Sequence, residues 1–191
     1  MIGFNFYRQS PRYVAPDAVR RIVEALPQAT CAVGVFVDED PEEIRNTAEL
    51  ANIRCVQLHG DFAGETCSEL ARGFRVIRAF STDTQFEPRN AAAFSNCDVL
   101  VDAYHRDLRG GTGQTCDWSA ARATLPFTRF LILSGGLNSQ NVGEAIATVT
   151  PHAVDVCSGV ESAPGVKNHD ALKEFISAVR DAERAKVPSH A

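Results

Sequence analysis

The sequence predicts an α/β fold made of repeated strand–helix units, either a closed (β/α)8 barrel or a doubly wound open sheet. Three observations support this prediction. Short apolar runs rich in β-branched and aromatic residues recur roughly every 25 residues along the chain. These runs mostly lack strict apolar–polar alternation, as expected for parallel strands that are covered on both faces. Segments with helical spacing of apolar residues lie between the runs.

Seven strands and seven helices are expected, one unit fewer than a complete eight-stranded barrel. The expected strands cover residues 2–7, 31–37, 54–60, 75–80, 98–104, 129–135 and 153–159. The expected helices cover residues 16–26, 41–51, 65–73, 87–95, 118–124, 141–149 and 168–185. Pro16 and Asp17 suit the first turn of the first helix. We therefore expect one domain over residues 1–185 and a frayed tail at 186–191.

Composition restricts the class of protein. The chain has 191 residues, 45% of them hydrophobic and 23% charged, which is typical of a globular protein. The net charge is −5 and there is no block of lysine or arginine, which argues against nucleic acid or an anionic membrane as a partner. No apolar run approaches the ~20 residues of a membrane span. The six cysteines are scattered without metal-ligand spacing, so free thiols in a reducing cytoplasm are expected, with no metal.

Polar residues gather where the predicted strands end, which is where a βα barrel carries its chemistry. Arg12 follows the first strand, His59 ends the third and Asp102 ends the fifth. Asp102 could act as a general acid or base, or could be a structural carboxylate that caps nearby N–H groups. Arg12 could bind a carboxylate with both arms of its guanidinium, or could be a surface residue. His59 could act as an acid or base, or could bond to neighbouring loops.

Glycine-bearing loops follow the last two strands. SGGLNSQN (134–141) contains Gly135, Gly136 and Asn138, with Asn138 or Ser139 as a possible N-cap of the next helix. SGVESAPG (158–165) opens with Ser158 and Gly159. Glycine-bearing loops on the last two strands are the usual phosphate site of a barrel, whereas a single such loop would only indicate a turn.

A third glycine-rich segment, GGTG (110–113), lies in the long loop after the fifth strand. Its glycines would give hinges and allow the main chain to approach a substrate closely, as in a mobile lid. The alternative is a surface loop without a function.

Together these stretches resemble the phosphoribosylanthranilate isomerase family of tryptophan biosynthesis. The resemblance rests on GFNFYRQSPRYV, VGVFVDED, VQLHGD, LVDA, GGTGQTCDW, SGGLNSQNV and VDVCSGVESAPGVKN, which occur in family order over nearly the whole chain. It implies a (β/α)8 barrel without a cofactor and an Amadori rearrangement of N-(5-phosphoribosyl)anthranilate. The implied partner is therefore a phosphoribosyl small molecule, and the implied assembly is a monomer or a homodimer.

The resemblance also implies a role for each candidate residue. Asp102 matches the general acid, and Arg12 matches the arginine that holds the anthranilate carboxylate. The other implied substrate contacts are His59, Gly111 and Gly113. The implied phosphate site is Gly135, Gly136, Asn138, Ser158 and Gly159.

One part of the family pattern has no counterpart in this sequence. The family's general base is a cysteine in a KxCG-type motif at the end of the first strand, and this chain resembles the family from the second strand onward. We expect that the first βα unit is absent and that turnover by the 191 residues is impaired. Two explanations are open: an incomplete sequence, or a non-catalytic protein that binds a phosphate ligand or another partner. A further alternative is another sugar-phosphate-binding barrel.

Overall fold

A computed structural model describes residues 1–82, 86–103 and 118–186 of the chain. The chain divides into two compact units. Unit 1 contains Met1–Phe80 and Ala91–Leu100, and unit 2 contains Ser81–Asn90 and Val101–Ala191. No helix within the described residues is long and apolar enough to cross a membrane.

Unit 1 is formed by alternating strands and helices. Its elements are β1 (Ile2–Asn5), α1 (Pro16–Ala25), β2 (Ala32–Val37), α2 (Pro41–Leu50), β3 (Cys55–His59), α3 (Gly64–Leu70), most of β4 (Arg75–Ser81) and the start of β5 (Asp98–Asp102). Neighbouring strands are parallel, with Phe4 beside Gly34, Gly34 beside Val56 and Val56 beside Val76. A helical crossover is the ordinary way to join parallel neighbours, and the three helices supply it.

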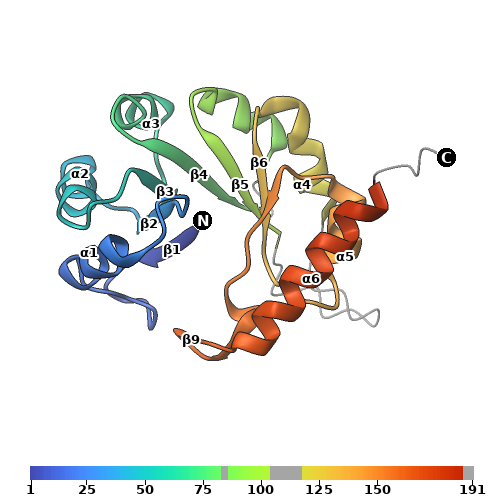
Figure 1. Ribbon diagram of the computed structural model, residues 1–191. Helices are drawn as coiled ribbons and strands as arrows, with labels where there is room; N and C mark the ends of the chain where they lie inside the picture. Colours follow the sequence, from blue (N-terminus) through green and yellow to red (C-terminus); the bar gives the residue numbers. More distant parts are fainter. Residues whose placement is uncertain (83–85, 104–117, 187–191) are drawn as a thin grey trace. The chain divides into compact units, whose positions relative to one another are not determined.

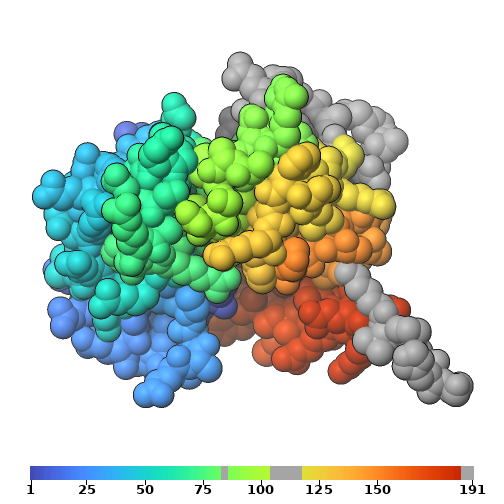
Figure 2. Space-filling model, turned by 90° about the horizontal axis from the view of Figure 1, so that it is seen from above, coloured from blue at the N-terminus to red at the C-terminus, as the bar shows by residue number. Residues whose placement is uncertain are grey.

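The core of unit 1 lies between these strands and helices. Phe4, Phe36 and Leu58 from the strands pack in one cluster with Ile44 and Leu70 from the helices. In Figure 1 the helices α1, α2 and α3 lie outside the strands that they connect. In the space-filling view α2 and α3 form adjacent parts of the surface, coloured blue and teal (Figure 2). Strand alternation leaves the other side chains, such as that of His59, on the opposite face.

Two helices of unit 1, α1 and α2, begin at the residues that the sequence predicts. α1 starts at Pro16, whose fixed φ suits a first turn, with Asp17 beside it. α2 starts at Pro41, and the Oδ1 of the preceding Asp40 accepts a hydrogen bond from the Glu42 main-chain N–H at 2.8 Å. Such a cap satisfies an N–H group that the helix itself cannot pair.

Unit 2 contains the later elements. They are α4 (Trp118–Thr124), the 3-10 turn η2 (Leu125–Phe127), β6 (Leu131–Ser134), α5 (Val142–Val149), β7 (Ala153–Val154), the 3-10 turn η3 (Ser158–Val160), β8 (Glu161–Ala163), β9 (Val166–Lys167) and α6 (His169–Lys186). β6 and β7 are parallel, with Leu133 beside Val154. Buried residues from β6, α5 and α6, including Leu133, Ile146 and Phe175, provide its apolar interior. α6 packs beside α5 (Figure 1).

The strand order confirms the expected fold class. Within the described residues, seven strands form one sheet in the order β1-β2-β3-β4-β5-β6-β7, which is also their order along the chain. A doubly wound sheet would reverse its order at a switch point, whereas a barrel-type sheet adds each new strand beside the previous one. The fold is therefore of the (β/α)8-barrel type with seven βα units.

Two expectations for individual elements were wrong, and one element was not expected. The segment expected as a helix at 87–95 is a 3-10 helix, η1 (Pro88–Phe94), in which Ala91 is the one buried side chain. With so little apolar surface to pack, an α-helical turn has little to hold it in place. The strand expected at 153–159 is only the two residues of β7, because the chain winds into η3 at Ser158. The hairpin of β8 and β9 carries no alternating apolar pattern and was not expected.

Candidate active site

His59 ends β3, and the turn that follows it is tied to the end of β2. The Asp38 N–H donates to the His59 carbonyl oxygen at 3.0 Å, and the Asp61 N–H donates to Asp38 Oδ1 at 2.8 Å. Asp38 adopts a left-handed backbone conformation with φ of 47°. That conformation is uncommon outside glycine and turns the chain sharply at the end of β2. The His59 Nε2 lies 2.8 Å from Gln57 Nε2 on the same strand.

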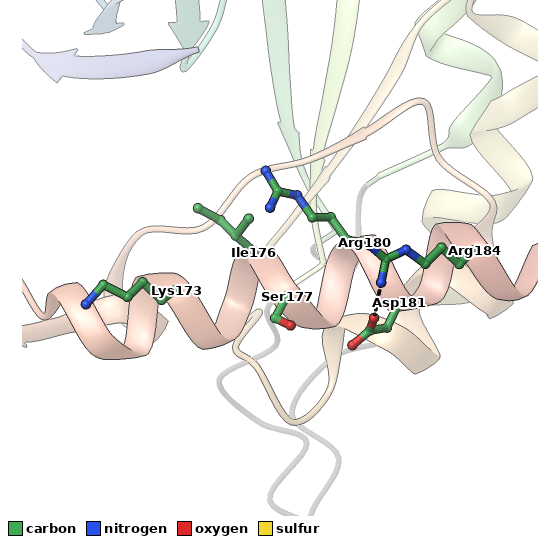
Figure 3. Close-up of a pocket in the computed structure, with 6 residues that line it drawn as sticks. All are labelled: Lys173, Ile176, Ser177, Arg180, Asp181 and Arg184. Carbon is green, nitrogen blue, oxygen red and sulfur yellow. Dashed lines mark hydrogen bonds and ion pairs between the residues drawn. The ribbon is translucent and has the colours of Figure 1, made fainter.

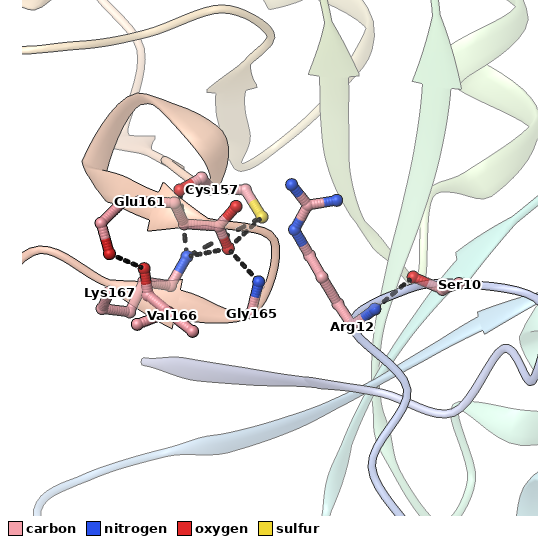
Figure 4. Close-up of polar contacts among 8 residues, drawn as sticks. Ser10, Arg12, Cys157, Glu161, Gly165, Val166 and Lys167 are labelled. Atoms are coloured by element: carbon pink, nitrogen blue, oxygen red, sulfur yellow. Dashed lines mark hydrogen bonds and ion pairs between the residues drawn. The ribbon is translucent and has the colours of Figure 1, made fainter.

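Arg12 lies in the turn that leaves β1. Its main-chain N–H donates to Ser10 Oγ at 3.1 Å, and the guanidinium extends away from this turn (Figure 4). The next residues lie beside the end of β1 in a parallel arrangement, since Tyr13 forms a parallel bridge with Asn5 and the Val14 N–H donates to the Asn5 carbonyl oxygen at 2.9 Å. The Arg12 turn is therefore fixed at the carboxyl end of β1, where the sequence predicts it.

Asp102 is the last residue of β5 and is half-buried. Its carbonyl oxygen accepts two hydrogen bonds from Thr82, one from the N–H at 3.0 Å and one from Oγ1 at 3.2 Å. The next residue, Ala103, donates its N–H to the Ser134 carbonyl oxygen at 3.0 Å. The main chain that carries the Asp102 carboxylate is thus held on both sides by hydrogen bonds.

The loop after β6 contains two glycines in the left-handed region. Gly135 has a φ of 97° and Gly136 a φ of 63°, and residues with a Cβ rarely adopt these values. The expected N-cap was wrong, because α5 begins at Val142 with Asn141 as its N-cap residue. Asn138 and Asn141 bind each other's main chain. Asn138 Oδ1 accepts from the Asn141 N–H at 3.2 Å, and Asn141 Oδ1 accepts from the Asn138 N–H at 2.9 Å.

The loop after β7 approaches the loop after β6 within van der Waals distance. A Cβ built on Gly159 would lie 1.9 Å from the Leu137 carbonyl oxygen and 3.2 Å from the Asn138 Cβ. The strand ends that carry these loops are also joined, since Ser134 Oγ at the end of β6 donates to Oδ2 of Asp155, just after β7, at 3.0 Å. The structure therefore brings together the two glycine-bearing loops that the sequence predicts as a phosphate site.

A cluster of polar groups at the β8–β9 hairpin was not predicted from the sequence. The Lys167 ammonium group donates to the Glu161 carboxylate and to the Cys157 carbonyl oxygen, both at 3.0 Å (Figure 4). The Glu161 carboxylate also accepts from the Gly165 N–H at 3.3 Å, and its side chain is only 4% exposed. These contacts close the β8–β9 hairpin and hold the chain that follows Ser158 and Gly159. Their signal in the sequence is the ESAPGVK segment, in which a charged residue lies on each side of a Pro-Gly turn.

A pocket of about 360 Å³ lies along α6 and is separate from the candidate residues. Its lining residues are Lys173, Ile176, Ser177, Arg180, Asp181 and Arg184 (Figure 3). They all belong to one helix, so the pocket is an exposed helix face with charged residues around Ile176. The described residues contain no group of three or more His, Cys, Asp and Glu side chains that could hold a metal ion.

Two of the predicted site residues, Gly111 and Gly113, lie outside the described residues together with the rest of the GGTG segment. Within unit 1 the structure locates Arg12 and His59 at strand ends, and within unit 2 it locates Asp102 and the two glycine-bearing loops at strand ends.

These features define a class: an α/β protein of the barrel type with polar and glycine-bearing strand ends suited to an anionic, phosphorylated small molecule. The family model described as N-(5'phosphoribosyl)anthranilate (PRA) isomerase matches residues 1–178. The chain belongs to this family.

Individual relatives agree with the family match. The N-(5'-phosphoribosyl)anthranilate isomerase of Thermotoga maritima is 42% identical over 175 residues, which cover 92% of this chain and 85% of the relative. The isomerase of Trichlorobacter lovleyi is 41% identical over 183 residues, covering 95% of this chain and 87% of the relative.

Solved structures match as well. The crystal structure of phosphoribosyl anthranilate isomerase from Thermotoga maritima aligns with a TM-score of 0.85 at 41% identity, covering 94% of this chain and 87% of that one. A phosphoribosyl anthranilate isomerase in complex with reduced 1-(o-carboxyphenylamino)-1-deoxyribulose 5-phosphate aligns with a TM-score of 0.82 at 40% identity, covering 94% and 86%. The resemblance seen in the sequence motifs is thereby confirmed for the fold and the family.

Proposed function

We propose that this chain binds N-(5-phosphoribosyl)anthranilate and acts in its isomerisation to 1-(2-carboxyphenylamino)-1-deoxyribulose 5-phosphate in tryptophan biosynthesis. The observation that carries the proposal is the 42% identity to the Thermotoga maritima isomerase over 92% of the chain. A solved relative at 40% identity binds the reduced form of the product named above. The substrate has two anionic ends, a phosphate and an anthranilate carboxylate, and a sugar ring between them.

The phosphate end is assigned to the loops of Gly135, Gly136, Asn138, Ser158 and Gly159. The contact between Gly159 and the Leu137–Asn138 main chain supports this assignment, because it draws two glycine-bearing loops to one point. Left-handed glycines let main-chain N–H groups approach a phosphate without interference from a Cβ.

The reacting end is assigned to Asp102 and Arg12. Asp102, as the general acid, protonates the furanose ring oxygen, and the ring opens to a Schiff base. The Arg12 guanidinium holds the anthranilate carboxylate by charge-assisted hydrogen bonds. His59, Gly111 and Gly113 provide further substrate contacts. A general acid held in position contributes roughly 10²–10⁴-fold to the rate.

The second proton transfer removes the C2′ proton of the Schiff base and gives an enolamine, which tautomerises to the ketone. The family resemblance assigns this transfer to a cysteine in a KxCG-type motif, and none of the six cysteines here lies in such a motif. We therefore assign substrate binding and the acid, but not the base, to residues of this sequence.

The proposal also covers the cellular compartment and the oligomeric state. The buried cysteines Cys55, Cys67 and Cys97 suit a reducing cytoplasm. One matched structure is of monomers generated from the dimeric Thermotoga maritima enzyme. For this chain we expect a monomer or a homodimer, which light scattering after gel filtration distinguishes.

Titration calorimetry with reduced 1-(o-carboxyphenylamino)-1-deoxyribulose 5-phosphate tests the proposal, because binding does not require the base. The 191-residue chain is expected to bind the compound, Arg12→Ala to bind it about 10-fold to 100-fold more weakly, and Gly136→Asp not to bind it. Arg20→Ala is a matched control, since Arg20 is an exposed residue of α1 that pairs with Glu24. No binding by a folded wild-type chain, or equal losses in Arg12→Ala and Arg20→Ala, would contradict the proposal.

A further inference from the structure

The turn that carries His59 is held by hydrogen bonds to one residue on each side, Asp38 after β2 and Arg78 of β4. On one side is Asp38 at the end of β2, whose two contacts with the His59 and Asp61 main chain are described above. On the other side is Arg78 of β4. Its Nη1 donates to the Leu58 carbonyl oxygen at 3.1 Å, and its Nη2 donates to the Gly60 carbonyl oxygen at 2.6 Å. The two carbonyl groups that Arg78 binds flank His59 directly.

Arg78 is a charged residue in the middle of a buried strand, and it is only 6% exposed. Among the described residues its hydrogen bonds all go to main-chain carbonyl oxygens, including that of Ala79. Its Nε is buried without a hydrogen-bond partner in the part of the chain that the structure describes. Burial lowers the pKa of the guanidinium, although nearby groups such as Cys67 and Asp61 act in the opposite direction. An apolar residue would avoid this desolvation cost, so the fold alone does not account for an arginine here.

The surroundings fix the guanidinium in one orientation. It lies over the Phe80 ring, 4.6 Å from the centroid, and also near the Phe94 ring at 5.4 Å. A planar group is suited to packing against aromatic rings while its two terminal nitrogens reach two separate acceptors. A lysine, with a single nitrogen, would retain the charge but not this geometry.

Arg78 acts on His59 from the other side of the sheet. Leu58, whose carbonyl Arg78 binds, belongs to the core cluster between the strands and the helices. Because side chains alternate along a strand, Gln57 and His59 lie on the opposite face. Arg78 therefore influences His59 through the main chain and has no need to contact a substrate itself.

We propose that Arg78 is a positioning residue for substrate binding. Arg78 binds the carbonyl groups on both sides of His59, and Asp38 binds the His59 and Asp61 main chain from the β2 side. Together these hydrogen bonds fix the imidazole at the carboxyl end of β3. The inference rests on the proposed function, in which His59 contacts the substrate.

Gly60, the residue after His59, lies against the Asp38 carboxylate. Its φ is 98°, and a Cβ at this position would lie 1.8 Å from Asp38 Oδ1. An alanine would thus displace the carboxylate that binds the Asp61 N–H. Gly60→Ala disturbs the turn from the β2 side, whereas a change at Arg78 disturbs it from the β4 side.

The test compares Arg78→Met, Arg78→Lys and Gly60→Ala with a matched control, Arg75→Met. Arg75 is on the same strand, but it pairs with Asp98 at 2.6 Å at the other end of β4, so its loss tests for a general effect on stability. The measurements are the Kd for reduced 1-(o-carboxyphenylamino)-1-deoxyribulose 5-phosphate, the NMR resonances of the His59 ring, hydrogen exchange at the Asp61 amide, and the melting temperature.

Arg78→Met and Gly60→Ala are expected to weaken binding by about 10²-fold, which is the effect of moving a positioned group by about 1 Å. Both are expected to shift the His59 resonances and speed exchange at Asp61. Arg78→Lys should recover part of the binding. Arg75→Met should lower the melting temperature while leaving the Kd within about twofold.

The inference is overturned if folded Arg78→Met keeps the wild-type Kd and His59 resonances, or if Arg75→Met weakens binding equally. If Arg78→Met does not fold, Arg78→Lys and Gly60→Ala decide by the same criteria. If the wild-type chain does not bind the compound, the proposed function fails separately. The His59 resonances and Asp61 exchange then decide whether Arg78 holds the turn, and unchanged values in Arg78→Met overturn it.

Discussion

Gly159 lies so close to Leu137 that a single added carbon atom would overlap the Leu137 carbonyl oxygen, at a distance of 1.9 Å. This contact joins the loop after β7 to the loop after β6. The obstacle is main chain, so neither partner can rotate away, as a flexible side chain could. The proposed phosphate site therefore depends on a residue without a Cβ at position 159.

Gly159→Ala is expected to separate the two loops and abolish phosphate binding. The melting temperature in the presence of inorganic phosphate measures this effect. A bound ligand at 100 times its Kd stabilises the wild-type chain by ~2.7 kcal/mol, and the variant should lose that increment. Overpacking should also cost the unliganded variant about 1–3 kcal/mol.

Gly143→Ala is the matched control for this prediction. Gly143 lies in α5, and a Cβ there would meet nothing within 4 Å. Alanine is favoured over glycine in a helix by roughly 0.5–1 kcal/mol, so this variant should be as stable as the wild type or slightly more stable. It should keep the phosphate shift. An intact shift in Gly159→Ala would show that phosphate binds elsewhere.

The Cys55 thiol gives a prediction for alkaline pH. Burial, and secondly the neighbouring Cys31, raise the pKa of Cys55 from 9.0 to about 12. In the unfolded chain the thiol ionises near pH 9, while in the folded chain it keeps its proton. This stabilisation is fully present below pH 9 and is lost as the pH rises toward 12.

Urea unfolding at pH 8 and pH 10.5 should reveal this dependence. The free energy of unfolding of the wild type is expected to fall more steeply with pH than that of Cys55→Ala, by at most about 1.4 kcal/mol per pH unit. Cys157→Ala serves as control, because Cys157 is exposed, and its pH dependence should follow the wild type. Parallel curves for wild type and Cys55→Ala would contradict the prediction.

The edge of unit 1 gives a prediction about stability. In the described residues β1 is paired with β2 through the register from Ile2 to Asn5, and Ile2 is 42% exposed. Ile22 on α1 is 44% exposed. A version extended with a relative's first βα unit should cover such apolar surface and supply strand partners. Its melting temperature should rise and its tendency to aggregate should fall. An unchanged melting temperature in an extended chain that is monomeric and folded would contradict this.

Asp102 can be tested as the general acid in that extended version. Asp102→Asn preserves shape and is expected to leave the melting temperature nearly unchanged while lowering kcat by roughly 10²–10⁴-fold. KM should change less, because the acid acts in the chemical step. Steady-state kinetics with N-(5-phosphoribosyl)anthranilate would measure both constants. Wild-type turnover in Asp102→Asn would show that the carboxylate is structural.

Much of the fold was predictable because strands and helices leave periodic patterns. The runs that became β2, β3 and β4 are rich in apolar residues, and the Pro16 and Pro41 starts are local signals that the structure confirms. β7 was predicted too long, because the distinction between a strand and the η3 turn depends on contacts with the preceding loop. Such contacts are tertiary and leave no periodic trace in the sequence.

The candidate site was predictable at the strand ends but not in its supporting residues. Arg12, His59 and Asp102 were predicted as site residues because each lies at or just after the end of an expected strand. Arg78 was missed because one charge inside RVIRAF does not reveal that its guanidinium reaches the carbonyl groups beside His59. A charged residue in a run expected to be buried is nevertheless a usable signal, since such a residue is costly unless it has partners.

Turnover of N-(5-phosphoribosyl)anthranilate by the extended version, measured beside the 191-residue chain, tests the central claim most directly. The account predicts that the extended version converts the substrate to 1-(2-carboxyphenylamino)-1-deoxyribulose 5-phosphate. It predicts that the 191-residue chain binds the reduced product with little or no turnover. An extended version that folds and binds the reduced product but does not turn over the substrate would contradict the claim. Full turnover by the 191-residue chain would instead show that one of its own residues serves as the base.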